Sequence, residues 1–221
     1  MNRLAIVVVV VVVVVAAGLA ADAHSAPGTG EIAGIVMVNG NKPGAGVVVY
    51  LEGEYGPPPV PRDHAVIRQR EKQFDPPLTV VVRGTTIDFP NQDKVFHNVF
   101  SVSQAARFDF GLYKSGTSMS VEMRRSGAVD VYCNIHPDMI AKVKILDNAY
   151  YTITDPRGRF RLQGVPPGDV ALVAWLPSGD QATLTVHVTA GDVADVKLAL
   201  VAVAKQHSHT RKDGTPYGRY N

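Results

Sequence analysis

The sequence predicts an all-β protein, through its turn residues, its valine runs and its lack of helical patterning. Gly occurs 20 times and Pro 15 times in the 221 residues, and both residue types favour tight turns. Runs rich in valine lie between these turn residues, and β-branched side chains favour strands. From Val66 to Leu146 no segment shows the apolar spacing typical of an amphipathic helix. We therefore expect short strands arranged as β-sandwiches.

The N-terminal segment, residues 1–23, is typical of a secretory signal peptide. Arg3 supplies the positive start, an apolar run of 18 residues follows from Leu4, and Ala21-Asp22-Ala23 fits a small-x-small cleavage site. A run of this length is also sufficient for an uncleaved membrane anchor. We expect cleavage and a periplasmic location without stable membrane insertion. A membrane-anchored protein facing the periplasm is the alternative.

Residues 24–64 are expected to form an N-terminal hairpin followed by a proline-rich linker. Ile32, Ile35 and Val38 precede a turn of sequence Asn39-Gly40-Asn41-Lys42-Pro43-Gly44, and Val47–Leu51 then has the composition of a strand. Gly56-Pro57-Pro58-Pro59-Val60-Pro61 cannot join a central ladder, because proline lacks a backbone N–H. The sequence predicts a stiff connector here.

Residues 65–147 are expected to form a domain of their own. Leu78–Val82 and Thr86–Phe89 flank a turn at Gly84, and the remaining expected strands are Val95–Ser101, Ser120–Met123, Ala128–Cys133 and Ala141–Leu146.

Residues 148–204 are predicted as a second β unit. Tyr151–Thr154 and Arg159–Leu162 flank the turn Asp155-Pro156-Arg157-Gly158, and Val170–Trp175 is typical of a buried strand. The last residues, 205–221, are polar and basic and are predicted to be disordered.

One stretch carries the chemistry: Tyr132-Cys133-Asn134-Ile135-His136-Pro137-Asp138-Met139-Ile140. It holds the only cysteine of the chain, with a histidine at +3 and a methionine at +6, and His97 lies 36 residues upstream. A thiolate, two imidazoles and a thioether form a soft donor set, and a Cys-His-His plane with a weak axial Met is the blue-copper arrangement. In an oxidising compartment this cysteine has no internal disulfide partner, so metal binding is a natural use of its thiolate.

Strand alternation predicts that these donors meet. Cys133 shares a strand face with Val129 and Val131, and His97 shares one with Val95 and Val99. Both donors should project inward from neighbouring strands, while the short loop after the cysteine returns His136 and Met139 to the same point. Each residue alone has a plainer role, in the core or in the strand. The four together favour copper, with zinc as the alternative, although structural zinc sites rarely recruit a thioether.

At these residues the sequence resembles the cupredoxins, the type 1 blue copper proteins. The resemblance covers Phe74 to Leu146, includes Gly84-Thr85-Thr86-Ile87-Asp88-Phe89-Pro90-Asn91, and has a short Cys-x2-His-x2-Met loop of the amicyanin type. It implies a Greek-key β-sandwich with one type 1 copper ion. The implied ligands are His97, Cys133 and His136, with Met139 axial, and Asn98 would tie the ligand strand to the loop near Asn134.

Two further resemblances refine the prediction. Phe96-His97-Asn98-Val99-Phe100-Ser101 and Phe108-Asp109-Phe110-Gly111-Leu112-Tyr113 look like periplasmic plastocyanin-like proteins that are often labelled methylamine utilization proteins. That label names a genomic association and no activity. Residues 149–203 resemble the second half of a carboxypeptidase regulatory-like β-sandwich, and Glu31–Leu51 resembles its first half. We therefore expect the copper domain to be inserted into this small sandwich.

The expected function is one-electron transfer, and no enzyme activity is expected, because protein ligands fill all four positions and no substrate base or nucleophile accompanies them. His136 should carry the electron through a rim of Ile135, Pro137 and Ile140 to a transient partner such as a c-type cytochrome or a dehydrogenase. A formal charge of +2 argues against a nucleic-acid partner.

Two alternative functions use the same residues differently. The protein could hold copper for delivery or resistance, or the regulatory-like sandwich could recognise a glycan or protein beside a vestigial metal site. Cleavage after Ala23 would expose His24, whose terminal amine and imidazole can chelate copper, although nothing in the sequence assigns the second histidine that such a brace requires.

Overall fold

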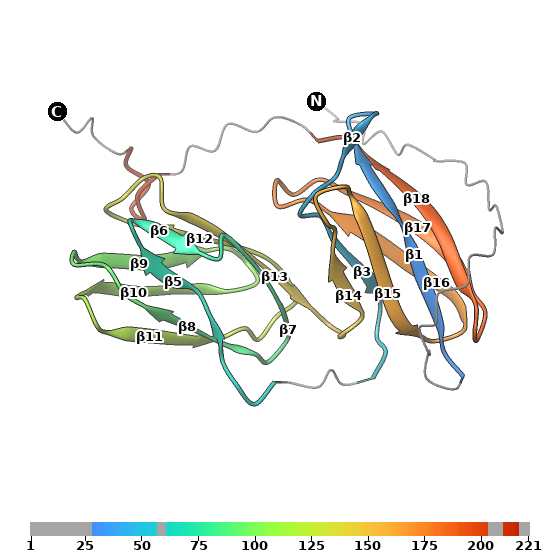
Figure 1. The fold of residues 1–221 in the computed structure, drawn as a ribbon. Helices are drawn as coiled ribbons and strands as arrows, with labels where there is room; N and C mark the ends of the chain where they lie inside the picture. Colours follow the sequence, from blue (N-terminus) through green and yellow to red (C-terminus); the bar gives the residue numbers. More distant parts are fainter. Residues whose placement is uncertain (1–27, 57–60, 203–209, 217–221) are drawn as a thin grey trace, which may run out of the picture. The chain divides into compact units, whose positions relative to one another are not determined.

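The computed structural model describes residues 28–56, 61–202 and 210–216 (Figure 1). The predicted signal segment 1–23, His24, most of the proline-rich connector, and His207 and His209 lie outside these ranges. Within them every regular element is a β-strand, as expected from the turn residues and valine runs. Across the described parts of the chain, no helix has the length and hydropathy needed to cross a membrane.

The strands form two compact units. The first consists of Met1–Glu52 with Tyr150–Val203, and the second of Gly53–Ala149 with Ala204–Asn221. The middle of the chain is therefore one unit, and the segments before and after it combine into the other. We call them the split unit and the central unit.

The split unit is a sandwich of two sheets. One sheet has the order β15-β1-β18, with β2 also paired to β1, and the other has the order β14-β3-β16-β17. The strands are β1 (Gly30–Val38), β2 (Lys42–Pro43), β3 (Val48–Glu52), β14 (Tyr151–Ile153), β15 (Arg159–Val165), β16 (Gly168–Trp175), β17 (Gln181–Val188) and β18 (Val193–Leu200).

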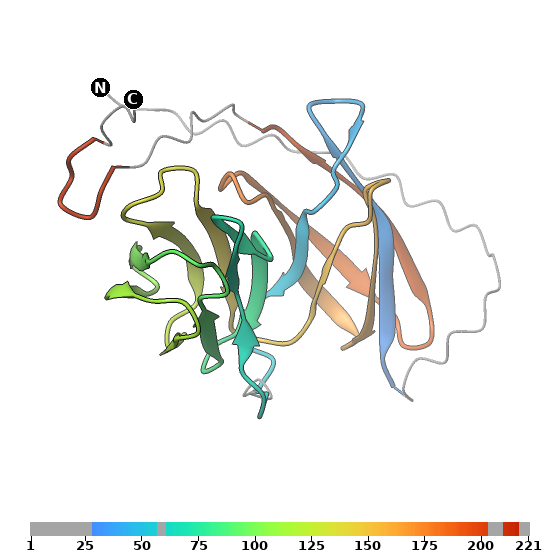
Figure 2. The same cartoon turned by 60° about the vertical axis from the view of Figure 1, so that its left-hand side comes forward.

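The split unit depends on pairings between residues far apart in sequence. The first strand, β1, runs between β15 and β18, antiparallel to the former and parallel to the latter (Figure 2). Gly34 faces Val196 across the parallel pair, and a Cβ added at Gly34 would lie 2.0 Å from the carbonyl oxygen of Val196. A side chain is therefore excluded at this position by the closeness of the two backbones.

The central unit is also a sandwich. Its larger sheet has the order β10-β9-β12-β13-β7, its smaller sheet has the order β11-β8-β4, and β5 pairs with β6. The strands are β4 (Ala65–Val66), β5 (Arg68–Arg70), β6 (Gln73–Asp75), β7 (Leu78–Val82), β8 (Thr86–Pro90), β9 (His97–Val102), β10 (Arg107–Tyr113), β11 (Ser118–Glu122), β12 (Gly127–Cys133) and β13 (Ile140–Leu146).

Alternating apolar residues from the two sheets of the central unit form its core. Ile87 and Phe89 on β8 are fully buried, as are Val129 and Val131 on β12. The Phe89 ring contacts the rings of Phe108 and Phe110 on β10, with centroids 5.8 and 5.7 Å apart. Cys133 and Met139 belong to the same buried cluster, so the proposed donors lie at the edge of a packed core.

Several elements differ from the sequence-based expectation, which did not include β2, β4 or β18. The strand β10 was not expected, because Asp109 and Gly111 interrupt its pattern where its register with β9 shifts. The hairpin of β5 and β6 was also missed, since both strands have only three residues. Of the C-terminal tail, the structure describes residues 210–216, in which the backbone amide of Arg211 donates to the Thr215 carbonyl across 2.8 Å.

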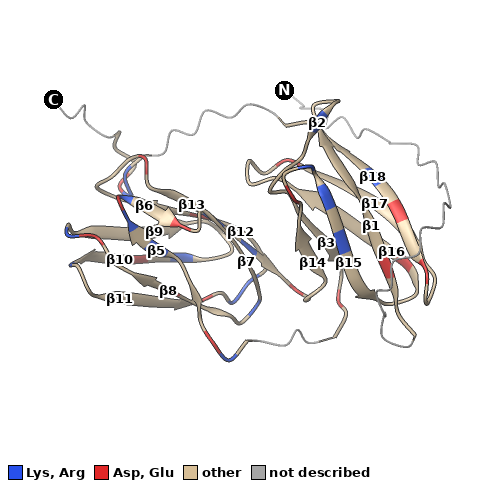
Figure 3. Ribbon diagram, viewed as in Figure 1, with Lys and Arg blue, Asp and Glu red and all other residues tan. Residues whose placement is uncertain are grey.

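Charged residues are interspersed on both units. Figure 3 shows both Lys or Arg and Asp or Glu positions on the strands and loops of each unit. On β15, Arg161 contacts the buried carboxylate of Glu31 at 2.7 Å. This mixed pattern accords with a formal net charge of +2.

Candidate metal centre

Two neighbouring strands of the central unit carry the first two donors. β9 begins at His97 and β12 ends at Cys133, and the strands pair antiparallel with Cys133 opposite Val99. Because paired residues share a face and side chains alternate along a strand, Cys133, Val99 and His97 all point to the same side of the sheet. That side is the buried one, since all three residues have no solvent exposure.

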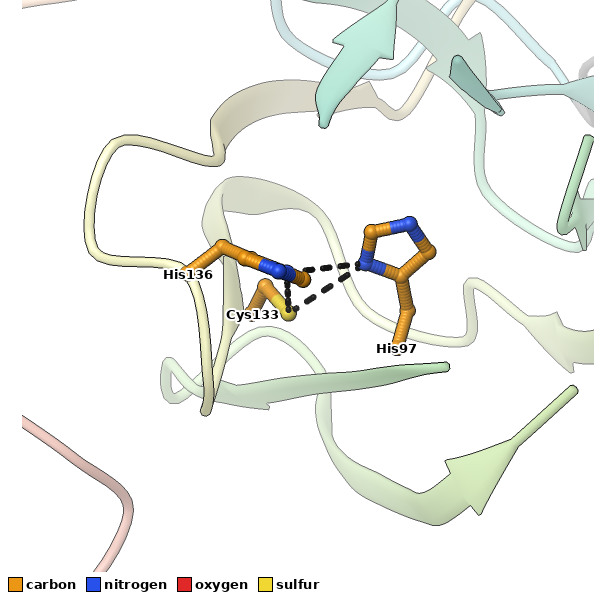
Figure 4. Close-up of side chains that lie close together, drawn as sticks. All are labelled: His97, Cys133 and His136. Atoms are coloured by element: carbon orange, nitrogen blue, oxygen red, sulfur yellow. Dashed lines mark hydrogen bonds between the residues drawn. The ribbon is translucent and has the colours of Figure 1, made fainter. Parts of the chain in front are cut away.

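The donor atoms of three residues converge on one point. The Sγ of Cys133 lies 3.7 Å from Nδ1 of His97 and 3.6 Å from Nδ1 of His136, and the two Nδ1 atoms are 3.1 Å apart. Figure 4 shows this triangle, with both imidazoles turned towards the sulfur. Among the described residues, these three form the one group of histidine, cysteine and acidic side chains close enough to share an ion.

The triangle fits a metal ion held in its plane. Zinc, a typical divalent ion, binds thiolate at about 2.3 Å and imidazole at about 2.0 Å, so a trigonal plane requires S–N separations of about 3.7 Å and an N–N separation of about 3.5 Å. The observed S–N distances of 3.6 and 3.7 Å match, and the N–N distance of 3.1 Å corresponds to a smaller angle between the imidazoles. Two imidazole nitrogens facing a thiol are suited to bind a cation in common.

The loop between β12 and β13 contains the third donor, His136, and places it beside the first two. The Met139 amide donates to the His136 carbonyl at 3.2 Å, and the Cys133 amide donates to the Met139 carbonyl at 3.3 Å. These bonds close the loop after the cysteine into a tight turn. Met139 is fully buried in the core of the central unit, and its role as axial donor stays a prediction.

His136 differs from the other two donors in its exposure. His97 and Cys133 are fully buried, whereas His136 is partly exposed. Burial lowers the pKa of His136, and the nearby His97 and Lys72 lower it further against the opposing charge of Asp93. The neutral imidazole, the form that binds a metal, is thereby favoured.

The comparisons with known proteins concern parts of the chain. Residues 140–201 match the carboxypeptidase regulatory-like domain family. A search of curated proteins gave no match. The expectation of a regulatory-like β-sandwich in the C-terminal half is confirmed, and the family match does not extend to the residues before the central unit.

Several solved structures resemble part of the chain. A reduced amicyanin variant is 22% identical, with a TM-score of 0.36, and the match covers 44% of this chain and 97% of that one. A purple cupredoxin from Nitrosopumilus maritimus is 22% identical, with a TM-score of 0.34 and coverage of 37% and 98%. A copper-containing nitrite reductase from Thermus scotoductus SA-01 is 19% identical, with a TM-score of 0.36 and coverage of 37%.

The chain spans 22% of that nitrite reductase, so the match concerns a small part of the larger enzyme. The predicted all-β class is confirmed by the described elements, and the regulatory-like domain by the family match. The assignment of ligands depends instead on the donor triangle described above.

The two asparagines that follow the strand-end ligands connect in a different way from the expectation. The backbone N–H of Asn134 donates to the backbone carbonyl of Asn98 at 3.0 Å, so the hydrogen bond between strand and loop involves the backbone of Asn98 and not its side chain. The carboxamide of Asn98 donates instead to Asp109 at 2.7 Å. Asp109 also accepts from Lys212 at 2.6 Å, and the Lys212 amide donates to the Asn134 side chain at 2.9 Å. The C-terminal turn thus joins this network.

Sequence reasoning missed Asp93, which contacts the first ligand. Its Oδ2 lies 2.8 Å from Nε2 of His97. Burial opposes its ionisation, but hydrogen bonds from the Lys72 amide, His97 and the Glu71 amide outweigh this and keep the pKa of Asp93 below its usual value. A signal was available, because an acidic residue four positions before a ligand histidine can reach its ring. Its significance depended on the distant turn at Glu71, which the sequence does not reveal.

The surface beside the loop is partly apolar. Ile135, Pro137 and Ile140, expected as an exposed rim, are each only partly exposed, and Ile135 packs against the core. More exposed apolar side chains precede the first ligand, where Val95 is 40% and Phe96 58% exposed. The apolar surface near the ligands therefore includes residues that the sequence analysis did not assign to it.

Proposed function

We propose that the protein is a type 1 copper protein that carries single electrons. The observation that supports this most directly is the triangle of His97 Nδ1, Cys133 Sγ and His136 Nδ1, with sides of 3.1, 3.6 and 3.7 Å. A thiolate with two imidazoles in one plane, beside a buried methionine, is the donor set of blue-copper centres. Zinc remains the alternative ion, and the thioether disfavours it.

The residues hold these donors rigidly. Bound there, copper supplies a couple between Cu(II) and Cu(I), which differ by one electron. His97 and Cys133 are fixed by the pairing of β9 with β12, and the loop bonds of Met139 hold His136 in place. A close-packed core behind the donors resists movement, so they keep one geometry suited to both oxidation states.

Burial of the donors favours a carrier over a protein that delivers copper. His97, Cys133 and Met139 have no solvent exposure, and His136 alone among the four is partly exposed. A partner that accepts the ion would need access to several donors, whereas an electron requires only close approach to the outermost one. The same burial leaves little room for a substrate, and we propose no enzyme activity.

The partner in this proposal is a redox protein that binds briefly. The partly exposed His136 lies in a loop with Ile135 and Pro137, and such an apolar rim suits a small interface with a c-type cytochrome or a dehydrogenase. The interspersed charges in Figure 3 do not favour a nucleic acid. We also propose a periplasmic location, on the basis of the N-terminal segment, while the methylamine utilization label stays a prediction.

A copper titration tests the proposal. We expect the purified full chain to bind one copper per chain and to show an intense thiolate-to-Cu(II) charge-transfer band in the visible range. The variants Cys133→Ser and His136→Ala should lose the band. His187→Ala serves as the matched control, because His187 is exposed on β17 of the split unit and contacts Asp169 at 2.7 Å.

Two outcomes would count against the proposal. Absence of the band in the wild-type protein would remove the carrier and leave a binding module with a vestigial site. A band together with irreversible loss of Cu(I) on reduction would instead favour copper delivery. Reversible cycling by one electron in voltammetry is the result expected of a carrier.

A further inference from the structure

Asp93 contacts the buried ligand His97 on the side away from the donor triangle. Its Oδ2 lies 2.8 Å from His97 Nε2, and the two side chains are 13% and 0% exposed. In Figure 4, one ring nitrogen of His97 is directed towards Cys133 and His136, and the other points away from them. An ionised carboxylate can only accept hydrogen bonds, so the ring nitrogen that faces Asp93 must carry the proton.

The carboxylate of Asp93 is itself held from a different part of the chain. The amide of Glu71 donates to Oδ1 at 2.6 Å, and the amide of Lys72 donates to Oδ2 at 2.9 Å. Both residues belong to the turn between β5 and β6 and have a φ of 55°. Residues other than glycine rarely adopt this conformation, and here it directs two successive amides at one carboxylate.

The backbone of Asp93 is fixed as well. Its amide donates to Asn91 Oδ1 at 3.0 Å, and the Asn91 carboxamide donates to the carbonyls of Val95 and Tyr113 at 2.9 and 3.3 Å. Asn91 has almost no solvent exposure. Asp93 is therefore oriented by contacts on both sides.

We propose that Asp93 is the positioning residue of this metal centre, holding the His97 imidazole in the one tautomer and ring orientation that present Nδ1 to the ion. A neutral imidazole has a single ring proton, and the hydrogen bond from Nε2 to Asp93 leaves Nδ1 with a free lone pair. The inference rests on the proposed copper function. It adds a residue outside the four donors and a role for the turn between β5 and β6.

The negative charge of Asp93 has a second consequence. A carboxylate that accepts from a ligand histidine makes the imidazole a stronger donor. A stronger donor and a nearby negative charge both stabilise Cu(II) more than Cu(I), because Cu(II) has the higher charge. The reduction potential should therefore be lower than in the same centre with a neutral residue at position 93.

The test compares variants of the full chain after copper loading. Asp93→Asn keeps an oxygen acceptor but removes the charge, so we expect a retained charge-transfer band and a higher reduction potential. Asp93→Ala removes the acceptor, and we expect the affinity for Cu(II) to fall about 10–100-fold. Asp88→Asn is the matched control, because Asp88 contacts a different histidine, His64, at 2.9 Å and should change neither value.

The protonated nitrogen of His97 provides a readout that a merely structural role would not predict. In nitrogen NMR of the metal-free wild-type protein, we expect the proton of His97 on Nε2, and in metal-free Asp93→Ala we expect it to be shared between Nε2 and Nδ1. A proton on Nδ1 would overturn the inference. An unchanged potential in Asp93→Asn would also overturn it, and this variant decides the matter even if Asp93→Ala does not fold.

The failure of this inference is distinguishable from failure of the proposed function. If the wild-type protein has no charge-transfer band, the copper function itself is wrong. If the wild type has the band but Asp93→Asn keeps the wild-type potential, only the role of Asp93 is wrong, and an affinity of Asp93→Ala for Cu(II) equal to that of Asp88→Asn would lead to the same conclusion.

Discussion

The backbone N–H of Asn134 donates to the backbone carbonyl of Asn98 across 3.0 Å. The residue after the cysteine is therefore bonded to the residue after the first histidine. The ligand strand and the ligand loop are thereby linked outside the donor triangle. The side chains of both asparagines extend this link, since Asn98 donates to Asp109 and Asn134 accepts from the amide of Lys212. The following predictions probe this network and the two units.

Replacing Asn98 with alanine should destabilise the central unit. Asn98 is 2% exposed, and its carboxamide donates to Asp109 at 2.7 Å. Loss of this buried donor to a charged acceptor should lower the free energy of unfolding by about 1–3 kcal/mol. Urea denaturation of the metal-free Asn98→Ala protein measures the change. An unaltered denaturation midpoint would show that the bond does not contribute to stability.

Replacing Met139 with leucine should change the potential more than the stability. Met139 is fully buried, and a leucine of similar volume should cost less than about 1.5 kcal/mol. The reduction potential should rise, because a weak axial donor stabilises Cu(II) and leucine offers none. Voltammetry measures this shift. Met123→Leu, at an equally buried methionine, is the control; a similar rise there would argue against an axial role for Met139.

Because of Asp109, the free energy of unfolding of the central unit should decrease at acidic pH. Burial opposes its ionisation, but hydrogen bonds from Lys212, Asn98 and the Gly111 amide outweigh this and hold its pKa below the usual value. A lowered folded-state pKa means that the unfolded chain binds the proton more readily. The stabilisation is therefore present above the unfolded pKa of about 3.9 and is lost as pH falls through the lower folded value.

Asp109→Asn isolates this contribution. We expect the difference in unfolding free energy between the metal-free wild type and this variant to be constant above about pH 5 and to shrink as the pH falls below about 4. Urea denaturation at a series of pH values provides the measurement. A difference that persists unchanged through the acid range would contradict the expected titration.

Replacing Lys212 with alanine should lower the stability of the central unit slightly, by an amount that depends on the salt concentration. Lys212 contacts Asp109 at 2.6 Å, but both side chains are about two-fifths exposed, at 42% and 41%. Such a pair contributes no more than about 1 kcal/mol, and added salt should reduce that contribution. Thermal unfolding of the central unit at low and high ionic strength measures it. Lys197→Ala, an exposed lysine on β18, is the control.

Gly34→Ala should destabilise the split unit alone. The added Cβ would lie 2.0 Å from the Val196 carbonyl oxygen, and forcing the strands apart should cost about 1–3 kcal/mol. Trp175, the single tryptophan, is buried in the split unit, so its fluorescence reports on that unit, while the charge-transfer band reports on the central one. The fluorescence transition should move to lower urea while the band's transition stays in place. Coincident shifts would show that the units unfold as one.

The regular strands and the donor set could be predicted from local patterns. The spacing of Cys133 and His136, together with alternation along the strands, was sufficient to predict that these two residues lie close to His97, whereas the axial role of Met139 stays a prediction. The insertion of one unit into the other was instead an expectation from resemblance, and the structure divides into compact units at Glu52 and Tyr150. The strands and the closeness of the donors depend on side-chain periodicity and on short turns, both of which a sequence displays directly.

What could not be predicted depends on contacts between distant segments. Asp93 acquires its role through amides of Glu71 and Lys72, which lie more than 20 residues earlier in a turn with an uncommon conformation. The C-terminal turn has a polar composition typical of disorder, and its order depends on Asp109 and Asn134, more than 70 residues away. Neither contact leaves a periodic pattern in the sequence.

The place at which the split unit is interrupted has a consequence for how the protein folds. Tyr50 on β3 pairs with Tyr151 on β14, and the Leu51 amide donates to the Tyr150 carbonyl at 3.0 Å. The central unit thus occupies the position of a hairpin loop, and its own ends are joined where Asn148 donates to the Gly53 carbonyl at 2.9 Å. Once the central unit has folded, it holds together two chain segments that are about a hundred residues apart in sequence. Folding of the central unit therefore removes most of the loop-closure entropy that opposes the pairing of β3 with β14. An ion that stabilises the inserted sandwich would thereby also promote assembly of its host, although it contacts no residue there.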